Sequence, residues 1–156
     1  MIYLGSKARI VDEILPIMLQ SMQPGQTFID AFCGGCNVIQ HVPPEYRRIA
    51  NDNNRYLIAM WKAITTTGWN PPTVIPPGSL IYCDPPYKGT TSYSTARSFD
   101  YDSFYDWTRQ MKRDGHIVFV SEYQMPGDFS CVWEKSITNN LNPTKTYTAV
   151  EKLWMV

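Results

Sequence analysis

A short apolar run that two prolines cut off constrains the fold of this chain more than any other feature. Residues 80–83, Leu-Ile-Tyr-Cys, are apolar and partly β-branched or aromatic, which is typical of a buried parallel strand. Pro85 and Pro86 then remove two backbone donors and fix two φ angles, so the chain must leave the sheet in a rigid, extended turn. We therefore expect Asp84 and Tyr87 on a stiff loop at the carboxyl end of a strand, where open α/β sheets bind ligands.

This turn suits chemistry on the exocyclic amine of a nucleobase. Such an amine is a poor nucleophile because its lone pair is delocalised into the ring. The carboxylate of Asp84 and the carbonyl of Pro85 can each accept one amine hydrogen, which pulls the nitrogen toward tetrahedral geometry and frees the lone pair. Tyr87 offers a face for a base that has swung out of a helix. The alternative is an ordinary turn with a solvated aspartate, but the strand before it and the aromatic residue after it favour a catalytic site.

A second strand, with a glycine-rich turn, lies nearer the N-terminus. Residues 27–32 predict a strand, residues 33–37 (Cys-Gly-Gly-Cys-Asn) a tight turn, and residues 38–41 a short helix. This order brings the polar part of a cofactor against backbone N–H groups. Residues 47–50 predict the next strand, and Asp52 follows it, placed either to bind ribose hydroxyls or to cap the helix after it.

The N-terminal segment predicts an amphipathic helix with a polar head. We expect Ser6 to cap the helix that follows. Apolar residues at i, i+4 spacing between Ile10 and Met22 form one buried face, and Pro16 should kink the helix. The head itself, residues 5–7 (Gly-Ser-Lys), is typical of a site for an anion or a carboxylate, because a helix N-terminus attracts negative charge.

The rest of the chain alternates loops with regular elements. A proline-rich loop is predicted at residues 68–79, and a polar loop at residues 88–100 is expected to cover the site. The remaining elements are a helix capped by Asp102 and ending at Asp114-Gly115, a buried strand at 116–120, and an antiparallel hairpin of 131–134 with 146–156. Residues 1–156 are therefore expected to form a single α/β domain whose sheet is mostly parallel.

Charge, hydropathy and cysteine usage narrow the class of protein. Fourteen basic and fourteen acidic residues among 156 leave no net charge, so any contact with nucleic acid must come from a local patch. There is no apolar run of membrane-spanning length and no signal peptide, so we expect a cytoplasmic protein. Cys33 and Cys36 have the spacing of a metal or redox motif, but their glycine spacer favours a tight loop, and we expect no metal.

In these motifs the chain resembles the Dam-like (alpha-group) family of DNA adenine methyltransferases. Residues 3–7 are similar to the family's N-terminal cofactor motif, residues 28–35 to its glycine motif, and residues 84–87 (Asp-Pro-Pro-Tyr) to its catalytic signature, in the order found in that family. The resemblance implies a Rossmann-like class I S-adenosylmethionine-dependent methyltransferase domain. It also implies S-adenosylmethionine as methyl donor and the N6 amino group of a flipped adenine in DNA as acceptor.

The resemblance also implies which residues form the site. The catalytic residues would be Asp84, Pro85, Pro86 and Tyr87. The cofactor-binding residues would be Tyr3, Gly5, Ser6, Lys7, Asp30, Ala31, Phe32, Cys33, Gly34, Asp52, Asn53 and Asp84. Among these, Tyr3 and Lys7 would contact the base and carboxylate regions of the cofactor, and Asp52 the ribose. In the loop after the catalytic signature, Lys88, Tyr93, Arg97 and Phe99 are the expected contacts with nucleic acid.

The chain departs from the family in two places. Ala31 stands where the glycine motif usually carries proline, and residues 53–79 hold only one helix and a proline-rich loop where family members insert a DNA-recognition region. We therefore expect weak or very short sequence preference, or recognition supplied by a partner or by a second copy of the chain. The alternatives are the same fold methylating RNA or a protein glutamine, and a cofactor-binding module without turnover.

Overall fold

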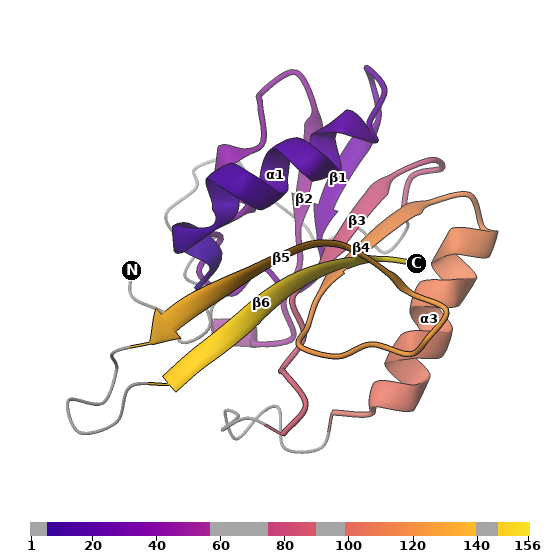
Figure 1. The fold of residues 1–156 in the computed structure, drawn as a ribbon. Helices are drawn as coiled ribbons and strands as arrows, with labels where there is room; N and C mark the ends of the chain where they lie inside the picture. The colour runs from indigo at the N-terminus through magenta and orange to yellow at the C-terminus, as the bar shows by residue number, and fades with distance from the viewer. Residues whose placement is uncertain (1–5, 57–74, 90–98, 140–146) are drawn as a thin grey trace.

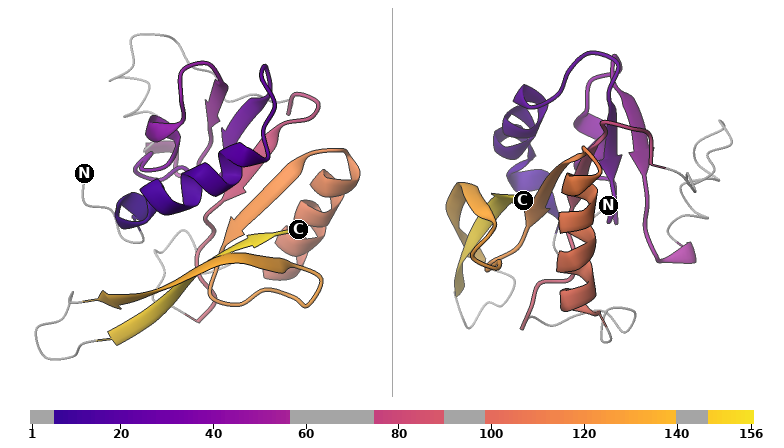
Figure 2. Two further views of the ribbon diagram at one scale, coloured as in Figure 1. Left: turned by 45° about the horizontal axis from the view of Figure 1, so that its top comes forward. Right: turned by 90° about the vertical axis from the view of Figure 1, so that its right-hand side faces the viewer.

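Four short parallel strands form one side of a sheet, and an antiparallel pair extends it on the other side. The computed structural model describes residues 6–56, 75–89, 99–139 and 147–156. In these ranges the strands are β1 (Thr27–Asp30), β2 (Arg47–Ala50), β3 (Leu80–Cys83), β4 (Ile117–Ser121), β5 (Ser130–Asn139) and β6 (Tyr147–Met155). The helices are α1 (Val11–Gln20) and α3 (Tyr101–Arg113), with 3₁₀ turns η1 (Lys7–Arg9) and η2 (Ile39–His41). Figures 1 and 2 show their arrangement.

The strand order places a topological switch point between β1 and β3. The order is β2-β1-β3-β4-β6-β5, in which the first four strands are parallel and β6 pairs antiparallel with both β4 and β5. The chain therefore runs outward from β1 to β2 and then crosses back to β3 on the other side. Ligands of open α/β sheets bind at the carboxyl ends of strands at such a point. The predicted fold class, a mostly parallel α/β sheet with a C-terminal antiparallel hairpin, is confirmed.

Alternating residues along the strands bury both faces of the sheet. One apolar cluster joins α1 to the first face, through Phe28, Leu80, Tyr82, Phe119 and Leu153. A second cluster joins α3 to the opposite face, through Ile29, Ile81, Cys83, Val118 and Val120. Successive strand residues point to opposite faces, so each central strand contributes to both clusters. This explains why β3 and β4 are nearly continuous apolar runs.

Several boundaries differ from the predicted ones because local hydrogen bonds decide them. Ser6 accepts a hydrogen bond from the Ala8 amide at 3.3 Å and so caps η1, while α1 begins only at Val11 and continues through Pro16. The segment predicted as a short helix at 38–41 is the 3₁₀ turn η2. The predicted hairpin strand at 131–134 is longer than expected, because β5 pairs with β6 as far as Asn139.

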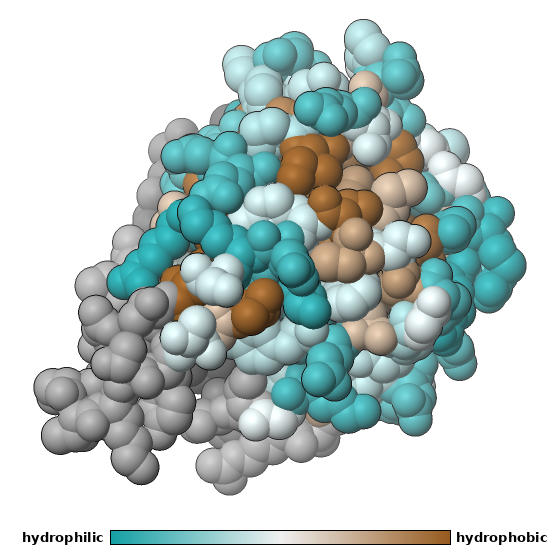
Figure 3. Space-filling model, in the orientation of Figure 1, coloured by the Kyte–Doolittle hydropathy of each residue, from teal (hydrophilic) through white to brown (hydrophobic). Residues whose placement is uncertain are grey.

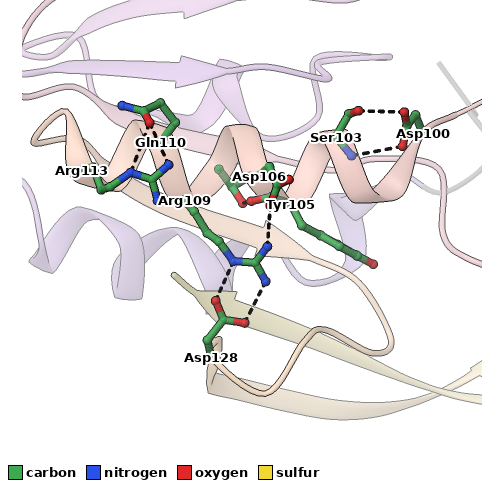
Figure 4. A network of polar contacts seen from close by, with 9 residues as sticks. Asp100, Ser103, Tyr105, Asp106, Arg109, Gln110, Arg113 and Asp128 are labelled. Atoms are coloured by element: carbon green, nitrogen blue, oxygen red, sulfur yellow. Dashed lines mark hydrogen bonds and ion pairs between the residues drawn. The ribbon is translucent and has the colours of Figure 1, made fainter.

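Asp100, rather than Asp102, caps α3. One carboxylate oxygen of Asp100 accepts the Ser103 amide at 3.1 Å, and the other accepts the Ser103 hydroxyl at 2.7 Å (Figure 4). Asp102 lies in the first turn of the helix, where its charge favours the N-terminal end of the helix dipole. The prediction was wrong by two residues, because both aspartates stand before the same apolar run and only the backbone geometry selects between them.

An ion pair on the surface ties the connection between β4 and β5 to α3. The guanidinium of Arg109 donates to both carboxylate oxygens of Asp128, at 2.7 and 2.9 Å, and also to Asp106 at 2.9 Å (Figure 4). The same guanidinium lies 5.5 Å from the ring centroid of Phe129, which is buried. This contact therefore positions the segment that carries Glu122 and Tyr123 from the end of β4 to the start of β5.

One face of the molecule carries apolar residues at its centre with hydrophilic residues around them (Figure 3). Figure 3 shows apolar residues gathered over the region of α1 and the adjoining sheet, with hydrophilic residues around them. Where the structure describes the chain, no helix has the length and apolar character needed to cross a membrane.

Replacing Leu153 by alanine tests the packing of the hairpin against α1. Leu153 is fully buried in β6, so truncation should lower the free energy of unfolding by about 2–5 kcal/mol. The control is Val150→Thr in the same strand: Val150 is exposed and the new side chain stays β-branched, so its effect should remain within about 0.5 kcal/mol. Urea denaturation measures both variants, and similar values for the two would contradict this packing.

Candidate active site

Acidic residues follow or end each of the four parallel strands at one edge of the sheet. Asp30 ends β1, Asp52 lies beyond β2, Asp84 follows β3 and Glu122 follows β4. Because the carboxyl ends of parallel strands meet at the same edge, the fold gathers these carboxylates around the switch point. The sequence predicted the first three as site residues, and the structure adds Glu122.

Lys7 forms an ion pair with Asp84 at this edge. The Lys7 ammonium lies 2.9 Å from one carboxylate oxygen of Asp84, and only 5% of the Lys7 side chain is exposed. It also lies 4.7 Å from the ring centroid of Tyr87, over the aromatic face. The N-terminal motif and the Asp-Pro-Pro-Tyr loop therefore form one site, although they are far apart in the sequence. The sequence predicted Lys7 as a cofactor contact, and its pairing with Asp84 was not foreseen.

The pKa values of this pair reflect a balance between burial and charge. Burial opposes the positive charge of Lys7, but the carboxylates of Asp84 and Glu151 outweigh burial and raise its pKa above the ordinary value for lysine. Burial raises the pKa of Asp84; Lys7 counteracts part of that rise, and the negative charge of Glu151 adds to it. Lys7 is therefore firmly cationic, and the Asp84 carboxyl holds a proton more readily than an exposed aspartate does.

Contacts from three other elements fix the Asp-Pro-Pro-Tyr loop. The Tyr101 hydroxyl of α3 donates to the Pro86 carbonyl at 3.0 Å, and the amide of Lys88 donates to Glu122 at 3.0 Å. The Tyr87 hydroxyl donates to Glu151 of β6 at 2.8 Å. The Tyr87 ring also meets the ring of Tyr123 edge-on, with centroids 4.6 Å apart. Tyr87 is thus held from several sides, which agrees with the stiff loop predicted from the two prolines.

Asp52 holds the glycine turn against the end of β2. One oxygen of its carboxylate accepts the Gly34 amide at 2.9 Å, and the other accepts the Asn54 amide at 2.8 Å. The Cys33 amide donates to the Asn51 carbonyl at 2.8 Å, and Gly34 has a φ of +44°, which favours glycine. Asp52 thus shapes the turn and accepts an amide at the start of the following segment. This agrees with helix capping, one of the two roles predicted for it. Its contact with a ribose remains a prediction, as does the role of its exposed neighbour Asn53.

Asp30 is a buried carboxylate with an oxygen that lacks a partner. Its exposed fraction is 2%, and within the described residues its Oδ1 atom accepts no hydrogen bond. Burial raises its pKa well above the usual range for aspartate, and the charge of Asp84 raises it further. A buried acceptor without a donor costs free energy, so it is expected to face a ligand that donates hydrogen bonds or carries positive charge.

The residues after Asp30 connect the glycine turn to the core. The Ala31 amide donates to the Tyr82 carbonyl at 2.9 Å, which ties the end of β1 to β3. The Phe32 ring packs edge-on against Phe104 of α3, with centroids 5.7 Å apart. It packs in the same manner against Phe99, at 6.0 Å.

This packing changes the expectation for nucleic-acid contacts. Phe99 lies in an aromatic cluster with Phe32, Tyr101 and Phe104, so its ring is engaged in the second apolar cluster and is poorly placed to fill the gap left by a flipped base. Lys88 is exposed, with its ammonium 5.6 Å from the ring centroid of Tyr101. The other predicted contacts, Tyr93 and Arg97, lie outside the described residues, as do the predicted cofactor residues Tyr3 and Gly5.

The two cysteines of the glycine turn interact with each other. Both are free thiols; a hydrogen bond between their side chains raises the pKa of Cys33 and lowers that of Cys36. Among the residues that the structure describes, no cluster of three or more histidine, cysteine, aspartate or glutamate side chains could hold a metal ion. The absence of a metal from the working protein stays a prediction.

Three site residues escaped the sequence interpretation. Glu122 and Tyr123 directly follow a buried strand, which is the signal that identified Asp84, so they could have been found the same way. Glu151 lies within a strand, and nothing in the local sequence distinguishes it from other half-exposed strand positions. Only the pairing of β6 with β4 brings it to this edge.

Comparisons with known proteins agree with this geometry. Residues 3–75 match the sequence profile of the D12 class N6 adenine-specific DNA methyltransferases. The predicted resemblance to the Dam-like family is confirmed over that range. The matched range includes the N-terminal motif, the glycine turn and Asp52, while the Asp84–Tyr87 loop lies beyond it. No protein with curated annotation has a sequence that matches this chain.

Solved structures identify the fold. Magnesium protoporphyrin IX methyltransferase (ChlM) from Synechocystis, solved with bound S-adenosylmethionine, is 13% identical with a TM-score of 0.55, and the match covers 97% of this chain and 80% of that one. DesVI from Streptomyces venezuelae is 9% identical with a TM-score of 0.52, covering 96% and 78%. HI0767 from Haemophilus influenzae is 11% identical with a TM-score of 0.52, covering 96% and 98%. The protein has the class I S-adenosylmethionine-dependent methyltransferase fold.

The buried charge of Asp30 should make stability depend on pH. The raised pKa of Asp30 in the folded state means that its contribution is fully present below the pKa of aspartate in the unfolded chain and is lost as pH rises toward the folded pKa. Asp30→Asn removes this loss. The variant should therefore be more stable than the wild type, by a margin that grows from pH 4 upward. Urea denaturation across this range measures it, with Glu45→Gln, at an exposed carboxylate in a turn, as control. A pH-independent difference would contradict the assignment.

Proposed function

We propose that this protein is an S-adenosylmethionine-dependent methyltransferase that acts on the N6 amino group of adenine in DNA. The observation that carries the proposal is Asp84, held on a rigid Asp-Pro-Pro-Tyr loop by the buried Lys7 at the switch point of a methyltransferase fold. The family match and the fold indicate S-adenosylmethionine as the cofactor. The choice of adenine in DNA rests on the family match and on the chemistry of the loop.

The residues at the carboxyl edge fit this cofactor. The orphaned oxygen of Asp30 is suited to the cofactor's ammonium group, because that contact would supply both the missing hydrogen bond and an opposite charge. The glycine turn, with the Gly34 backbone held by Asp52, would let the cofactor approach the chain closely, and Asp52 and Asn53 stand where ribose hydroxyls would be bound. When bound, S-adenosylmethionine supplies a methyl group on a positively charged sulfur.

Asp84 would act on the amine as its lone pair attacks the methyl carbon. Its carboxylate accepts one amine hydrogen and the Pro85 carbonyl the other, which localises the lone pair on nitrogen. A nitrogen–carbon bond forms, the carbon–sulfur bond breaks, and the amine nitrogen gives up one proton. The Asp84 carboxylate is the acceptor for that proton, and its raised pKa suits this role before the proton passes to solvent. Lys7 keeps the carboxylate oriented throughout.

The target base would reach this loop only after leaving its stack. Tyr87 is held by Glu151 and Tyr123, and so offers a fixed aromatic surface against which an extruded base can pack. Lys88 follows directly and is exposed, in reach of a phosphate near the extruded nucleotide. RNA bases and glutamine side chains are the alternative acceptors, and related signatures for them usually begin with asparagine. Aspartate at position 84 therefore favours a nucleobase amine.

Removing the Asp84 carboxylate should abolish methyl transfer while weakening cofactor binding less. The reason is that Asp84 interacts most strongly with the amine as charge develops on it, so its loss acts on the transition state. We expect Asp84→Ala and Asp84→Asn to lower kcat by at least about 100-fold. The measurements are transfer of labelled methyl to DNA and calorimetric binding of S-adenosylmethionine. Near-normal turnover in either variant would exclude this catalytic role.

The acceptor and its sequence context can be tested together. Labelled cofactor with DNA, RNA and protein acceptors identifies the substrate class, and mapping methylated adenines on a long random DNA then gives the sequence preference. We expect scattered methylation, or none until a partner is added, because residues 53–79 are too short for a recognition element whose good base contacts are each worth roughly 1–3 kcal/mol. Asp84→Asn is the negative control. Methylation at one strict site of four or more bases by the isolated monomer would be the opposite result.

A further inference from the structure

Glu151 of the C-terminal hairpin reaches the catalytic edge because of the strand register. β6 pairs antiparallel with β4 so that Leu153 lies opposite Ser121, the last residue of β4. Glu151 lies two residues before Leu153, so its side chain points to the same face of the sheet and extends beyond the end of β4. Leu153 belongs to the cluster that packs on α1, and Lys7 approaches from that same side. The register thus directs one carboxylate of the hairpin at the Asp84 loop.

Glu151 contacts both residues that hold Asp84 in place. One of its carboxylate oxygens accepts the Tyr87 hydroxyl at 2.8 Å, and the same oxygen lies 4.0 Å from the Lys7 ammonium. Lys7 in turn lies 2.9 Å from Asp84 and stands over the Tyr87 ring. Lys7, Asp84, Tyr87 and Glu151 therefore form one connected group. The Tyr87 hydroxyl holds Glu151, and the Lys7 ammonium lies closer to Asp84 than to Glu151.

Packing alone does not require a charged side chain at position 151. A neutral side chain such as glutamine could also accept the Tyr87 hydroxyl, through a weaker hydrogen bond. Two carboxylates beside one buried ammonium, by contrast, leave a net negative charge in a partly desolvated place. Lys135, directly opposite Glu151 on β5, bonds instead to Glu13 of α1. A costly charge that persists at a site is more readily explained by a role in that site than by stability.

We propose that Glu151 is a positioning residue for the methyl-transfer reaction, which makes the C-terminal hairpin part of the active site. It fixes the Tyr87 ring for the base and the Lys7 ammonium for Asp84, and its negative charge favours proton uptake by Asp84. The proposal rests on the proposed function for its kinetic part, while the arrangement itself can be tested without any substrate.

Three variants separate the contributions of Glu151. Glu151→Gln keeps an acceptor for the Tyr87 hydroxyl and removes the charge, so we expect kcat to fall about 10-fold with little change in cofactor affinity. Glu151→Ala also leaves Tyr87 without this acceptor, so kcat should fall about 100-fold, the effect of misplacing a catalytic group by about 1 Å. Glu134→Gln is the control, because Glu134 is an exposed hairpin carboxylate whose Lys152 partner lies 3.6 Å away; it should leave kcat unchanged.

The pH profile distinguishes this role from a structural one. Glu151 raises the pKa of Asp84, so Glu151→Gln should move the acid limb of the kcat profile to lower pH, while Glu134→Gln should not move it. Other charged or titratable groups surround Asp84 and Glu151. They are Lys7 of η1, Asp30 of β1, Tyr82 of β3, Tyr87 of the loop, Glu122 and Tyr123 after β4, and Lys135 of β5. All of these stay the same in the two variants. Unchanged kcat and an unmoved profile in Glu151→Gln would overturn the proposal.

A measurement without substrate keeps this proposal separate from the proposed function. Carbon NMR of labelled aspartate carboxyl groups can follow Asp84, assigned by the loss of its signal in Asp84→Asn. We expect the Asp84 carboxyl to titrate at lower pH in Glu151→Gln than in the wild type. If the wild type methylates no DNA yet this shift occurs, the proposed substrate is wrong and the arrangement around Asp84 holds. If DNA is methylated and Asp84 titrates identically in both proteins, Glu151 has no such role.

Discussion

The ion pair between Lys7 and Asp84 is the interaction on which the rest of this structure depends. It joins η1 to the loop after β3, while the apolar cluster of α1 holds the helix on one face of the sheet. Lys7 is almost fully buried, and a buried ammonium without a partner would be strongly unfavourable. The pair is therefore a condition for folding η1 onto this edge of the sheet. It also sets the orientation of the carboxylate that the proposed chemistry uses.

The edge that gathers these groups is unfavourable for stability and favourable for binding. Asp30, Asp84 and Glu122 are all carboxylates whose pKa values burial raises, and Lys7 is the described cation that lies among them. Their charges repel one another, and the clusters on both faces of the sheet, together with the hairpin, must offset that cost. A cationic cofactor bound here would relieve part of the repulsion. At Asp30 this balance implies a trade between stability without the cofactor and affinity for it.

The hairpin contributes to the site as well as to the core. Its inward residues, such as Leu153, complete the cluster beneath α1, and Glu151 on the same face reaches the Tyr87 hydroxyl. The connection before it carries Glu122 and Tyr123, and the Arg109–Asp128 pair holds that connection on α3. The loop that carries Asp84 is thus supported by groups from η1, α3, the end of β4 and β6. This support explains how a loop without regular structure of its own can hold a fixed geometry.

The sequence alone determined the elements whose signals are local. The sequence located β1 to β4 to within two residues. β3 and β4 were apolar runs, because a parallel strand in the interior of the sheet is covered on both faces, and the prolines after Cys83 determined the rigid turn. Asp52 and Asp84 could be identified because each lies just beyond a strand's carboxyl end, whereas Asp30 was expected only from the family resemblance. The tertiary structure alone decided that Lys7 pairs with Asp84, that Phe99 packs inward, and that Glu151 joins the site. These contacts join residues far apart in the chain, and their distances depend on strand order and register, which no local pattern of side chains specifies.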